Sequence, residues 1–279
     1  MTVGEIRSAV EACASLPPDG LGEAARAAFE ALMTGLEAGT IRAAEPAPEG
    51  WRVHAWVKQG ILLGFRLGRV VDTAAAGPLA FRDKDTFPTR RFAEADGVRL
   101  VPGGSAVRRG AYLGPGVVVM PPAYVNVGSY VGEGSLVDSH ALVGSCAQVG
   151  RRVHLSAGAM LGGVLEPAGA MPVIVEDEAL VGGNCGVYEG VVVGRRAVLG
   201  AGVVITASAP VYDLARKAVY RREPGRPLRI PEGAVVVPGS RRLADAFAER
   251  HGLALAAPVI VKYRDESTDA ATALEEALR

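Results

Sequence analysis

Residues 101–166 read, in consecutive blocks of six, VPGGSA VRRGAY LGPGVV VMPPAY VNVGSY VGEGSL VDSHAL VGSCAQ VGRRVH LSAGAM LGGVLE. Every block begins with valine or leucine, and its fifth residue is always alanine, serine, valine or leucine. A spacing of six fits neither an amphipathic helix nor an alternating strand. It is typical of a hexapeptide-repeat parallel β-helix, in which each block forms a short strand and a corner. We therefore predict a mainly β protein whose coils contain three blocks each.

The repeat also predicts where the chain leaves the coil. The six-residue frame stops after Glu166 and resumes at Val175, which indicates an ejected loop near residues 167–174. A second excursion, near residues 211–229, is rich in arginine and lysine. Both excursions are plausible walls for an active site, because functional residues are often carried on loops that a rigid scaffold positions.

The rest of the chain reads as two smaller units. We expect an α-rich N-terminal domain at residues 1–98, the β-helix at 99–240, and a C-terminal cap of strand and helix at 241–279. Within them, residues 72–91 read as irregular, 258–263 as a strand and 268–278 as a helix. The cap would cover strand edges that the last coil otherwise leaves open.

Composition narrows the class of protein. The 30 basic and 30 acidic residues cancel, which gives no support for a nucleic-acid or membrane-surface partner. Cys13, Cys146 and Cys185 form no CxxC motif and are odd in number, so we expect free thiols and a cytoplasmic protein. The first residues lack the basic and then apolar layout of a signal peptide.

Hexapeptide prisms resemble the left-handed β-helices of many acyltransferases that use coenzyme A or acyl carrier protein, and also carbonic-anhydrase-like proteins. Zinc chemistry needs several histidines. The chain has His54, His140, His154 and His251, of which only His140 and His154 fall in the coils. We therefore expect no metal site, while a carbonic-anhydrase-like protein and a non-catalytic scaffold stay as alternatives.

A series of longer motifs is more specific than the hexads. In order they are RLVP at 99–102, MPPAYVNVG at 120–128, VDSHALVGSCAQVG at 137–150, VHLS at 153–156, GGVLEP at 162–167, YEGVVV at 188–193, IPEGAVVVPGS at 230–240 and VIVK at 259–262. Together, over about residues 51–279, they resemble the tetrahydrodipicolinate N-succinyltransferase family.

The resemblance implies a homotrimer with active sites between neighbouring prisms. It implies direct transfer from succinyl-CoA, a co-substrate, to the amine of ring-opened tetrahydrodipicolinate, with no tightly bound cofactor. Asp138 matches the family's aspartate and Glu189 its glutamate, which makes them the expected amine-orienting or proton-accepting pair. Arg99 matches a substrate arginine, so Arg99 and Asp138 are the expected substrate-binding residues.

The hexad count tests whether one chain could bring this pair together. Asp138 falls on the first face of the prism, whereas Glu189 falls on the second face and about two coils further on. We therefore expect the two carboxylates to meet one substrate only if neighbouring chains contribute one each.

The coenzyme A site is less specific in the sequence. Candidates are residues where the backbone leaves room for a pantetheine arm, together with one lysine: Ala157, Gly158, Gly162, Gly163 and Lys262. The basic excursion and the Arg241-Arg242 pair are further candidates for binding the phosphates. No particular arginine is marked as the partner of the distal succinyl carboxylate, so an N-acetyltransferase on a similar amino-dicarboxylate stays as an alternative.

Two departures from the family pattern lie beside the proposed carboxylates. His140 stands where family members often carry tryptophan, and Cys185-Gly186-Val187-Tyr188 replaces a Ser-Glu-Val-Val run.

Overall fold

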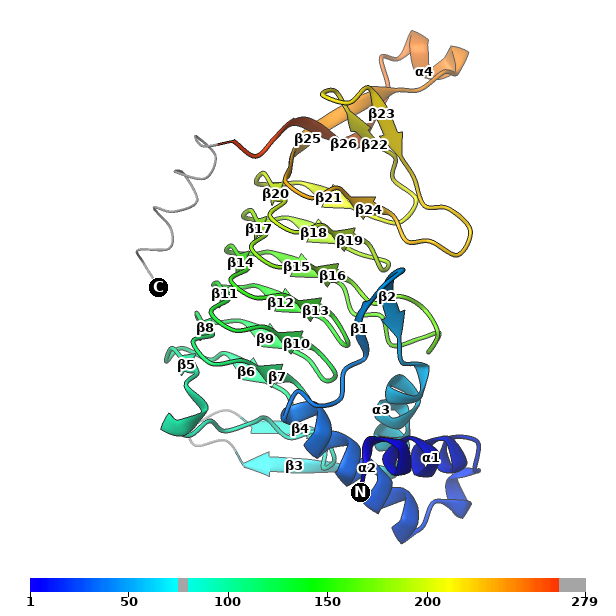
Figure 1. Ribbon diagram of the computed structural model, residues 1–279, viewed down its shortest axis with the longest axis vertical. Coiled ribbons are helices and arrows are strands. Elements are labelled where there is room, and N and C mark those ends of the chain that lie inside the picture. Colours follow the sequence, from blue (N-terminus) through cyan, green and yellow to red (C-terminus); the bar gives the residue numbers. More distant parts are fainter. Residues whose placement is uncertain (75–79, 266–279) are drawn as a thin grey trace.

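A computed structural model describes residues 1–74 and 80–265 as a three-sided prism of parallel strands on an N-terminal helical domain (Figure 1). The first face contains β5 Arg99–Leu100, β8 Val118–Val119, β11 Leu136–Val137, β14 His154–Leu155, β17 Leu180–Val181, β20 Val198–Leu199 and β25 Ala234–Arg242. The second contains β6 Ala106–Val107, β9 Tyr124–Val125, β12 Leu142–Val143, β15 Met160–Leu161, β18 Gly186–Val187 and β21 Val204–Ile205. The third contains β7 Tyr112–Leu113, β10 Tyr130–Val131, β13 Gln148–Val149, β16 Ile174–Val175, β19 Val192–Val193 and β24 Arg229–Ile230. The predicted left-handed parallel β-helix is confirmed.

The pairing register shows why the period of six produces this prism. Val137 pairs with Val119 one coil below and with Leu155 one coil above, so equivalent residues recur every eighteen positions. The aliphatic residue that opens each hexad from Val107 to Val236 is buried in one continuous core. Burial of each such side chain contributes about 1.5–3 kcal/mol relative to exposure. The stacked aliphatic columns therefore hold the coils together.

The three faces meet at three edges, which we name by the faces they join. The first edge joins faces one and two and includes residues 138–141, 156–159 and 182–185. The second edge joins faces two and three and includes residues 144–147, 162–173 and 188–191. The third edge joins faces three and one and includes residues 150–153, 176–179 and 194–197.

The first excursion is an insertion in the second edge, between β15 and β16. Residues 162–173 connect the two strands, eight more than the four-residue corners of the neighbouring coils, so the length matches the predicted 167–174 but the position does not. Ile174 belongs to strand β16, and Val173 is fully buried at the inward corner position of the resumed hexad. Leu165, which the frame had assigned to that position, packs against the N-terminal domain instead.

The N-terminal domain contains three helices with a shared core. They are α1 Val3–Ala14, α2 Glu23–Glu37 and α3 Ala55–Leu67, with a 3-10 turn η1 Pro18–Gly20 between the first two. Thr2 caps α1 by accepting the N–H of Glu5, whose carboxylate in turn accepts the N–H of Thr2. The helical core includes Val127 and Cys146, which belong to the second edge of the prism.

Two hairpins and a short turn complete this region. Strands β1 Ala44–Ala47 and β2 Gly50–Val53 pair with each other beside the third face, whose Ile174 and Val192 pack with Ala44. Strands β3 Val70–Ala74 and β4 Ala80–Lys84 form a second hairpin, followed by the 3-10 turn η2 Glu94–Asp96. The expectation of irregular structure was therefore wrong for 72–74 and 80–84, which pair across the hairpin, whereas 85–91 form no helix or strand beyond an isolated bridge at Thr89.

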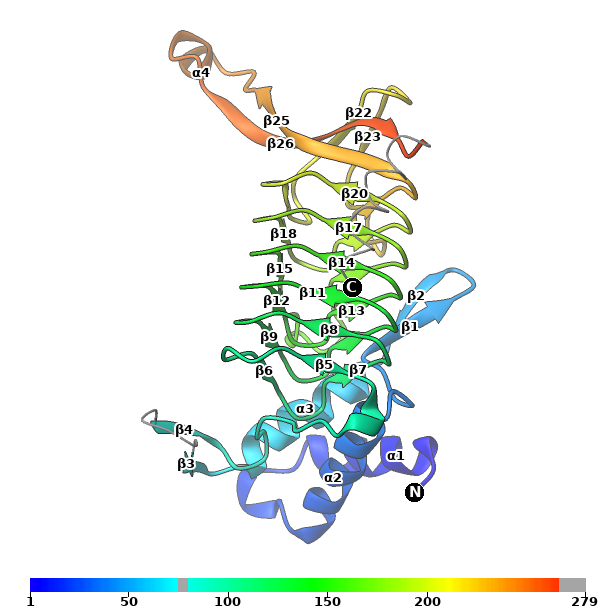
Figure 2. The ribbon, with the colours of Figure 1, turned by 90° about the vertical axis from the view of Figure 1, so that its left-hand side faces the viewer.

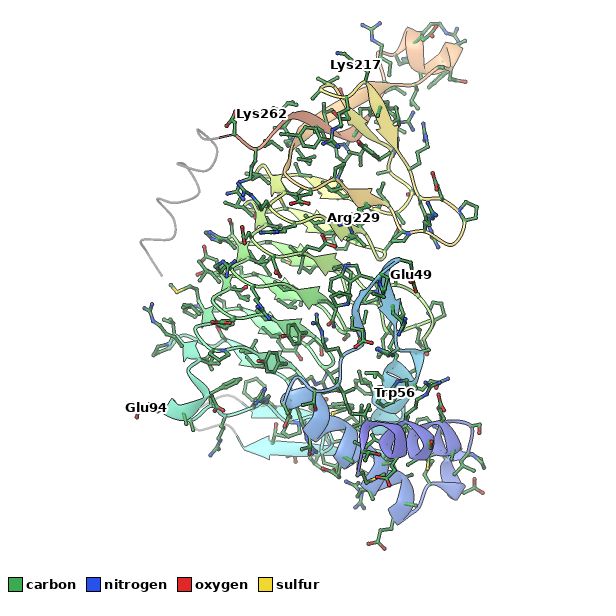
Figure 3. All side chains as sticks on the ribbon, in the orientation of Figure 1. Glu49, Trp56, Glu94, Lys217, Arg229 and Lys262 are labelled. Atoms are coloured by element: carbon green, nitrogen blue, oxygen red, sulfur yellow. The ribbon has the colours of Figure 1, made fainter. Side chains whose placement is uncertain are left out.

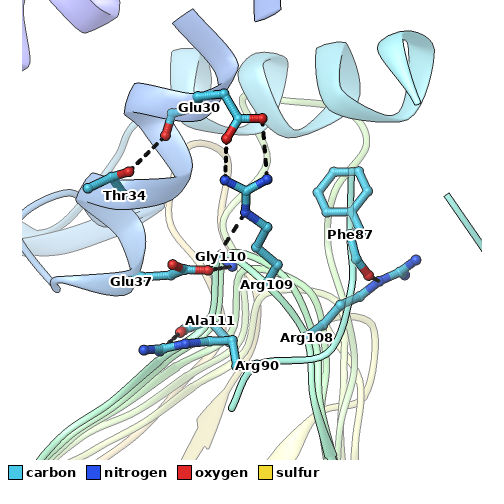
Figure 4. A network of polar contacts seen from close by, with 9 residues as sticks. All are labelled: Glu30, Thr34, Glu37, Phe87, Arg90, Arg108, Arg109, Gly110 and Ala111. Carbon is cyan, nitrogen blue, oxygen red and sulfur yellow. Dashed lines mark hydrogen bonds and ion pairs between the residues drawn. The ribbon is translucent and has the colours of Figure 1, made fainter. Parts of the chain in front are cut away.

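Polar contacts dock the helices onto the lowest coil (Figure 4). Arg109 donates to both carboxylate oxygens of Glu30, and Glu37 accepts the N–H of Gly110 at 2.9 Å. The Arg90 guanidinium donates to the carbonyl of Ala111 at 2.6 Å. These bonds satisfy backbone groups that the first coil cannot pair with a coil below it.

The C-terminal segment covers the far end of the prism (Figure 2). The second excursion contains the hairpin of β22 Val211–Asp213 and β23 Ala218–Tyr220, and β25 leaves the last coil to pair with β26 Ala254–Tyr263 after the short helix α4 Ala246–Arg250. Strand β25 runs through residue 240, where we had placed a domain boundary. The helix expected at 268–278 lies outside the described residues. In the described part of the chain, no helix has the length and apolar character needed to cross a membrane.

Candidate active site

Asp138 lies at the first edge, directly after β11. Its Oδ1 atom accepts the N–H of Ser139 at 2.6 Å, and no bond to the other carboxylate oxygen is found within the described residues. The neighbouring His140 has a left-handed backbone (φ 62°) and an exposed side chain. One oxygen of Asp138 is therefore fixed by its own corner, which leaves the second available to a ligand.

Glu189 lies at the second edge, after β18, and its backbone departs from the coil pattern. In the described coils, other non-glycine residues with positive φ occupy the fourth position of a hexad, whereas Glu189 (φ 56°) occupies the third. Gly190 follows with φ 74°. A left-handed non-glycine residue costs about 1–3 kcal/mol, and such strain is concentrated at functional sites. Glu189 Oε2 accepts the N–H of Ala207 at 3.0 Å, which holds the exposed side chain in place.

The two carboxylates occupy different edges of one prism, as the hexad count predicted. Val137, before Asp138, lies in a first-face strand, and Val187, before Glu189, lies in a second-face strand. Val143 shares the coil of Val137 and is separated from Val187 by the coil of Leu161. At about 4.8 Å per coil, the separation along the axis is roughly 10 Å, with the second face between the two edges. One chain cannot place both carboxylates on one amine.

A cleft of about 980 Å³ opens at the second edge beside Glu189. Its walls are the insertion, the corner at Tyr188–Gly190, and the loop of the second excursion. The lining residues are Val53, Gly162, Gly163, Val164, Glu166, Pro167, Gly169, Ala170, Met171, Tyr188, Glu189, Gly190, Thr206, Arg222, Gly225, Arg226 and Pro227. Of the predicted site residues, the structure brings Glu189, Gly162 and Gly163 together here.

The other predicted residues lie elsewhere on the molecule. Arg99 is exposed on β5, two coils below Asp138 on the first face, and its side chain makes no hydrogen bond or ion pair within the described residues. Ala157 and Gly158 lie one coil above Asp138 on the first edge, where Gly158 N–H donates to the carbonyl of Ser139. Lys262 pairs with Asp265 at 3.0 Å and lies on the opposite side of the prism from Arg229 (Figure 3).

The predicted glycines do not leave open space for a pantetheine arm in the way we expected. A Cβ atom at Gly162 would lie 2.7 Å from the ring of Tyr188, and one at Gly158 would lie 2.5 Å from Asn184 Oδ1. The volume above each glycine is therefore filled by the chain's own side chains. Gly162 and Gly186 both make room for the Tyr188 ring, so the glycine at 186 and the tyrosine at 188 fit each other sterically.

Sequence analysis did not identify Lys58 as part of the surroundings of the cleft. Lys58 is fully buried in α3, and its Nζ donates to the carbonyl of Ala170 in the insertion at 2.6 Å. Burial lowers the pKa of this amine. The sequence signal that could have identified Lys58 is a lysine on the apolar face of a helix, because a buried ammonium group needs a hydrogen-bond acceptor. It ties the helical domain to one wall of the cleft.

No group of three or more metal-binding side chains occurs within residues 1–74 and 80–265.

Comparison with known proteins points to one family. The family model described as Tetrahydrodipicolinate N-succinyltransferase N-terminal matches residues 4–67, and that described as Hexapeptide repeat of succinyl-transferase matches residues 172–207. Over 98% of this chain and 97% of the relative, the sequence is 44% identical to the 2,3,4,5-tetrahydropyridine-2,6-dicarboxylate N-succinyltransferase of Polynucleobacter asymbioticus. Relatives with the same name from Gluconobacter oxydans and an Azoarcus strain are each 46% identical, over 91% and 98% of this chain and 90% and 97% of theirs.

Proposed function

The chain belongs to the tetrahydrodipicolinate N-succinyltransferase family, and we propose that its two carboxylates act together across a subunit boundary. The reaction transfers the succinyl group of succinyl-CoA to the amine of tetrahydropyridine-2,6-dicarboxylate in its open form, 2-amino-6-oxopimelate. It belongs to the diaminopimelate route to lysine.

The chemistry needs a proton acceptor beside the amine. An α-amine is protonated at neutral pH and must lose a proton before it attacks the thioester carbonyl. The new N–C bond then forms as the C–S bond breaks, the second amine proton passes to a carboxylate, and the coenzyme A thiolate takes up a proton. Asp138 and Glu189 suit these roles because each has one oxygen fixed by a backbone N–H and the other oxygen available.

A homotrimer would unite the pair. The observation that carries this proposal is the position of Asp138 and Glu189 on the two edges that border the second face. That face presents an uncharged outward column, in which Tyr124, Met160 and Val204 are between 36% and 53% exposed. The equivalent column of the third face is covered by the chain's own N-terminal segment. A second copy packed on the second face would cover the apolar column and bring Asp138 of one chain toward Glu189 of its neighbour.

Arg99 completes the proposed acceptor site. Its exposed guanidinium lies on the same face as Asp138 and is free to bind one of the two substrate carboxylates as a bidentate pair. For the donor, we place the thioester in the cleft beside Glu189 and Gly163, with Ala157 of the neighbouring chain along the pantetheine arm. Lys262 stays a candidate only for the distant phosphates.

The test of function is a steady-state comparison of succinyl-CoA and acetyl-CoA with tetrahydrodipicolinate as acceptor, following release of the coenzyme A thiol. We expect a larger kcat/KM with succinyl-CoA. Equal or faster turnover of acetyl-CoA would contradict the succinyl assignment. Sedimentation of the same preparation tests the assembly, for which a monomer at the assay concentration would be incompatible with a shared site.

A further inference from the structure

The basic excursion contains two arginines that reach the cleft. Of its six basic residues, Arg229 binds both oxygens of Glu176 at 2.9 and 2.6 Å, and Arg216 stacks on the ring of Tyr263 at 3.8 Å. Arg222 and Arg226 instead line the cleft that also contains Glu189. Arg216 and Arg229 are therefore engaged by the protein's own side chains, whereas Arg222 and Arg226 line a cleft that can bind a ligand.

A tight turn holds this pair over the cleft. Glu223 and Arg226 exchange backbone hydrogen bonds of 3.3 and 3.0 Å around Pro224-Gly225, and Gly225 has φ 75°. Proline followed by a glycine with positive φ is the pattern of a type II turn. Directly after the turn, Leu228 is fully buried and β24 joins the third face. The arginines are therefore carried on a short loop with a fixed base rather than on a long free segment.

The charges in the cleft favour an anion. Neither Arg222 nor Arg226 has an ion-pair partner within the described residues, and both are exposed. The acidic groups of the cleft are Glu166 and Glu189, and Glu189 already accepts the N–H of Ala207. Two unpaired guanidinium groups on one wall make a site for a carboxylate or phosphate, which arginine binds through paired N–H donors.

We propose that Arg222 and Arg226 bind the distal carboxylate of the succinyl donor and so make the enzyme prefer succinyl-CoA to acetyl-CoA. This inference rests on the proposed function. A thioester carbonyl placed beside Glu189 puts the succinyl carboxylate three bonds away, on the same side of the cleft. The phosphates of coenzyme A are separated from that carbonyl by the whole pantetheine arm, so the acyl carboxylate is the donor anion nearest to Glu189.

The experiment measures kcat/KM for succinyl-CoA and acetyl-CoA in Arg222→Gln, Arg226→Gln and the double variant. Loss of a charge-assisted hydrogen-bond pair should lower kcat/KM for succinyl-CoA roughly ten- to hundredfold and leave the value for acetyl-CoA within about twofold. Arg222→Lys and Arg226→Lys should recover part of the loss. Arg221→Gln is the matched control, because Arg221 is an exposed arginine of the same loop that does not line the cleft.

Three outcomes would overturn the proposal. An equal fall with both donors would indicate a role in binding coenzyme A itself, and a rise confined to the KM of tetrahydrodipicolinate would assign the arginines to the acceptor. Unchanged kinetics would remove them from the site. Thermal unfolding of each variant separates these results from misfolding. If the wild-type protein transfers no succinyl group at all, the proposed function fails independently of either arginine.

Discussion

The first and second edges of the prism are built from the same hexads, yet they present their carboxylates in different surroundings. Asp138 lies on an edge of unbroken, stacked corners with the strands in register above and below. Glu189 lies on an edge that is interrupted by the insertion and contacted by α3. Residues of the second excursion line the cleft beside it. In the proposed trimer each edge would supply half of a site: the first edge an open carboxylate, and the second edge a carboxylate beside a cleft. The difference explains why a neighbouring copy would complete both.

The largest effect should come from removing either carboxylate. Asp138→Asn and Glu189→Gln should each lower kcat by at least about 100-fold, because each removes a group proposed to orient or deprotonate the amine. Co-refolding the two inactive variants in equal amounts should restore activity at about one quarter of the sites, since a cyclic trimer then pairs an intact Asp138 with an intact Glu189 at random. Activity that stays at the level of the single variants would show that the edges do not meet.

A glycine on each edge tests how tightly the insertion is packed. A Cβ atom at Gly144, on the second edge, would lie 2.2 Å from the backbone nitrogen of Gly163, whereas one at Gly183, on the first edge, meets its nearest atom, the Ala157 carbonyl, at 3.4 Å. Gly144→Ala should therefore cost about 1–3 kcal/mol of stability and raise the KM for the donor, because backbone cannot move aside cheaply. Gly183→Ala is the control and should be close to neutral. Thermal unfolding and donor kinetics measure both, and similar losses at the two positions would contradict the contrast.

Lys58 tests whether the helical domain shapes the cleft. Burial lowers its pKa below the ordinary 10.5, so between the lowered value and 10.5 the unfolded chain binds more protons and stability rises with pH. Lys58→Met should abolish that rise. It should also increase the donor KM about fivefold, because the Ala170 carbonyl loses a bond worth about 1 kcal/mol.

The nearby Cys146 thiol also contributes to the pH dependence of stability in that experiment. Burial raises its pKa to about 12, which makes stability fall with pH above about 9, the opposite sign. The Lys58 charge itself lowers the pKa of Cys146, so Lys58→Met and its parent are compared in a Cys146→Ala background, which removes the thiol from both proteins. Lys58→Arg, which keeps a charge but adds bulk, is the comparison variant. A donor KM that is unchanged in Lys58→Met would separate α3 from the cleft.

These edges also show which features a sequence can predict. The hexad period predicted the correct faces for Val137 and Val187. A shift of the frame by one residue would have turned every inward aliphatic residue out of the core, so the frame is strongly constrained. The period also located the insertion, but not its bounds, since Val173 rather than Leu165 returns to the core. The cleft depends on contacts between segments far apart in the chain, such as Lys58 with Ala170. No local spacing encodes such contacts, and none distinguished Arg222 and Arg226 from the other arginines of the excursion.

The smallest effect should come from the third edge, which serves as the reference for the other two. There Arg152 donates to Glu178 Oε1 at 2.6 Å, and Arg195 reaches the same oxygen at 3.3 Å. The bond from Arg152 is the main cause that lowers the pKa of Glu178, so its contribution is present above the ordinary pKa of glutamate and is lost as pH falls through the lowered value. The Arg152 side chain is 55% exposed, so solvent and salt screen the pair, and Arg195 can replace it. Arg152→Gln should therefore change stability by less than about 0.5 kcal/mol and leave kcat and KM unaltered. A loss of activity in this variant would mean that charged residues on any edge support catalysis. The contrast between the first edge and the second edge would then not explain where the active site lies.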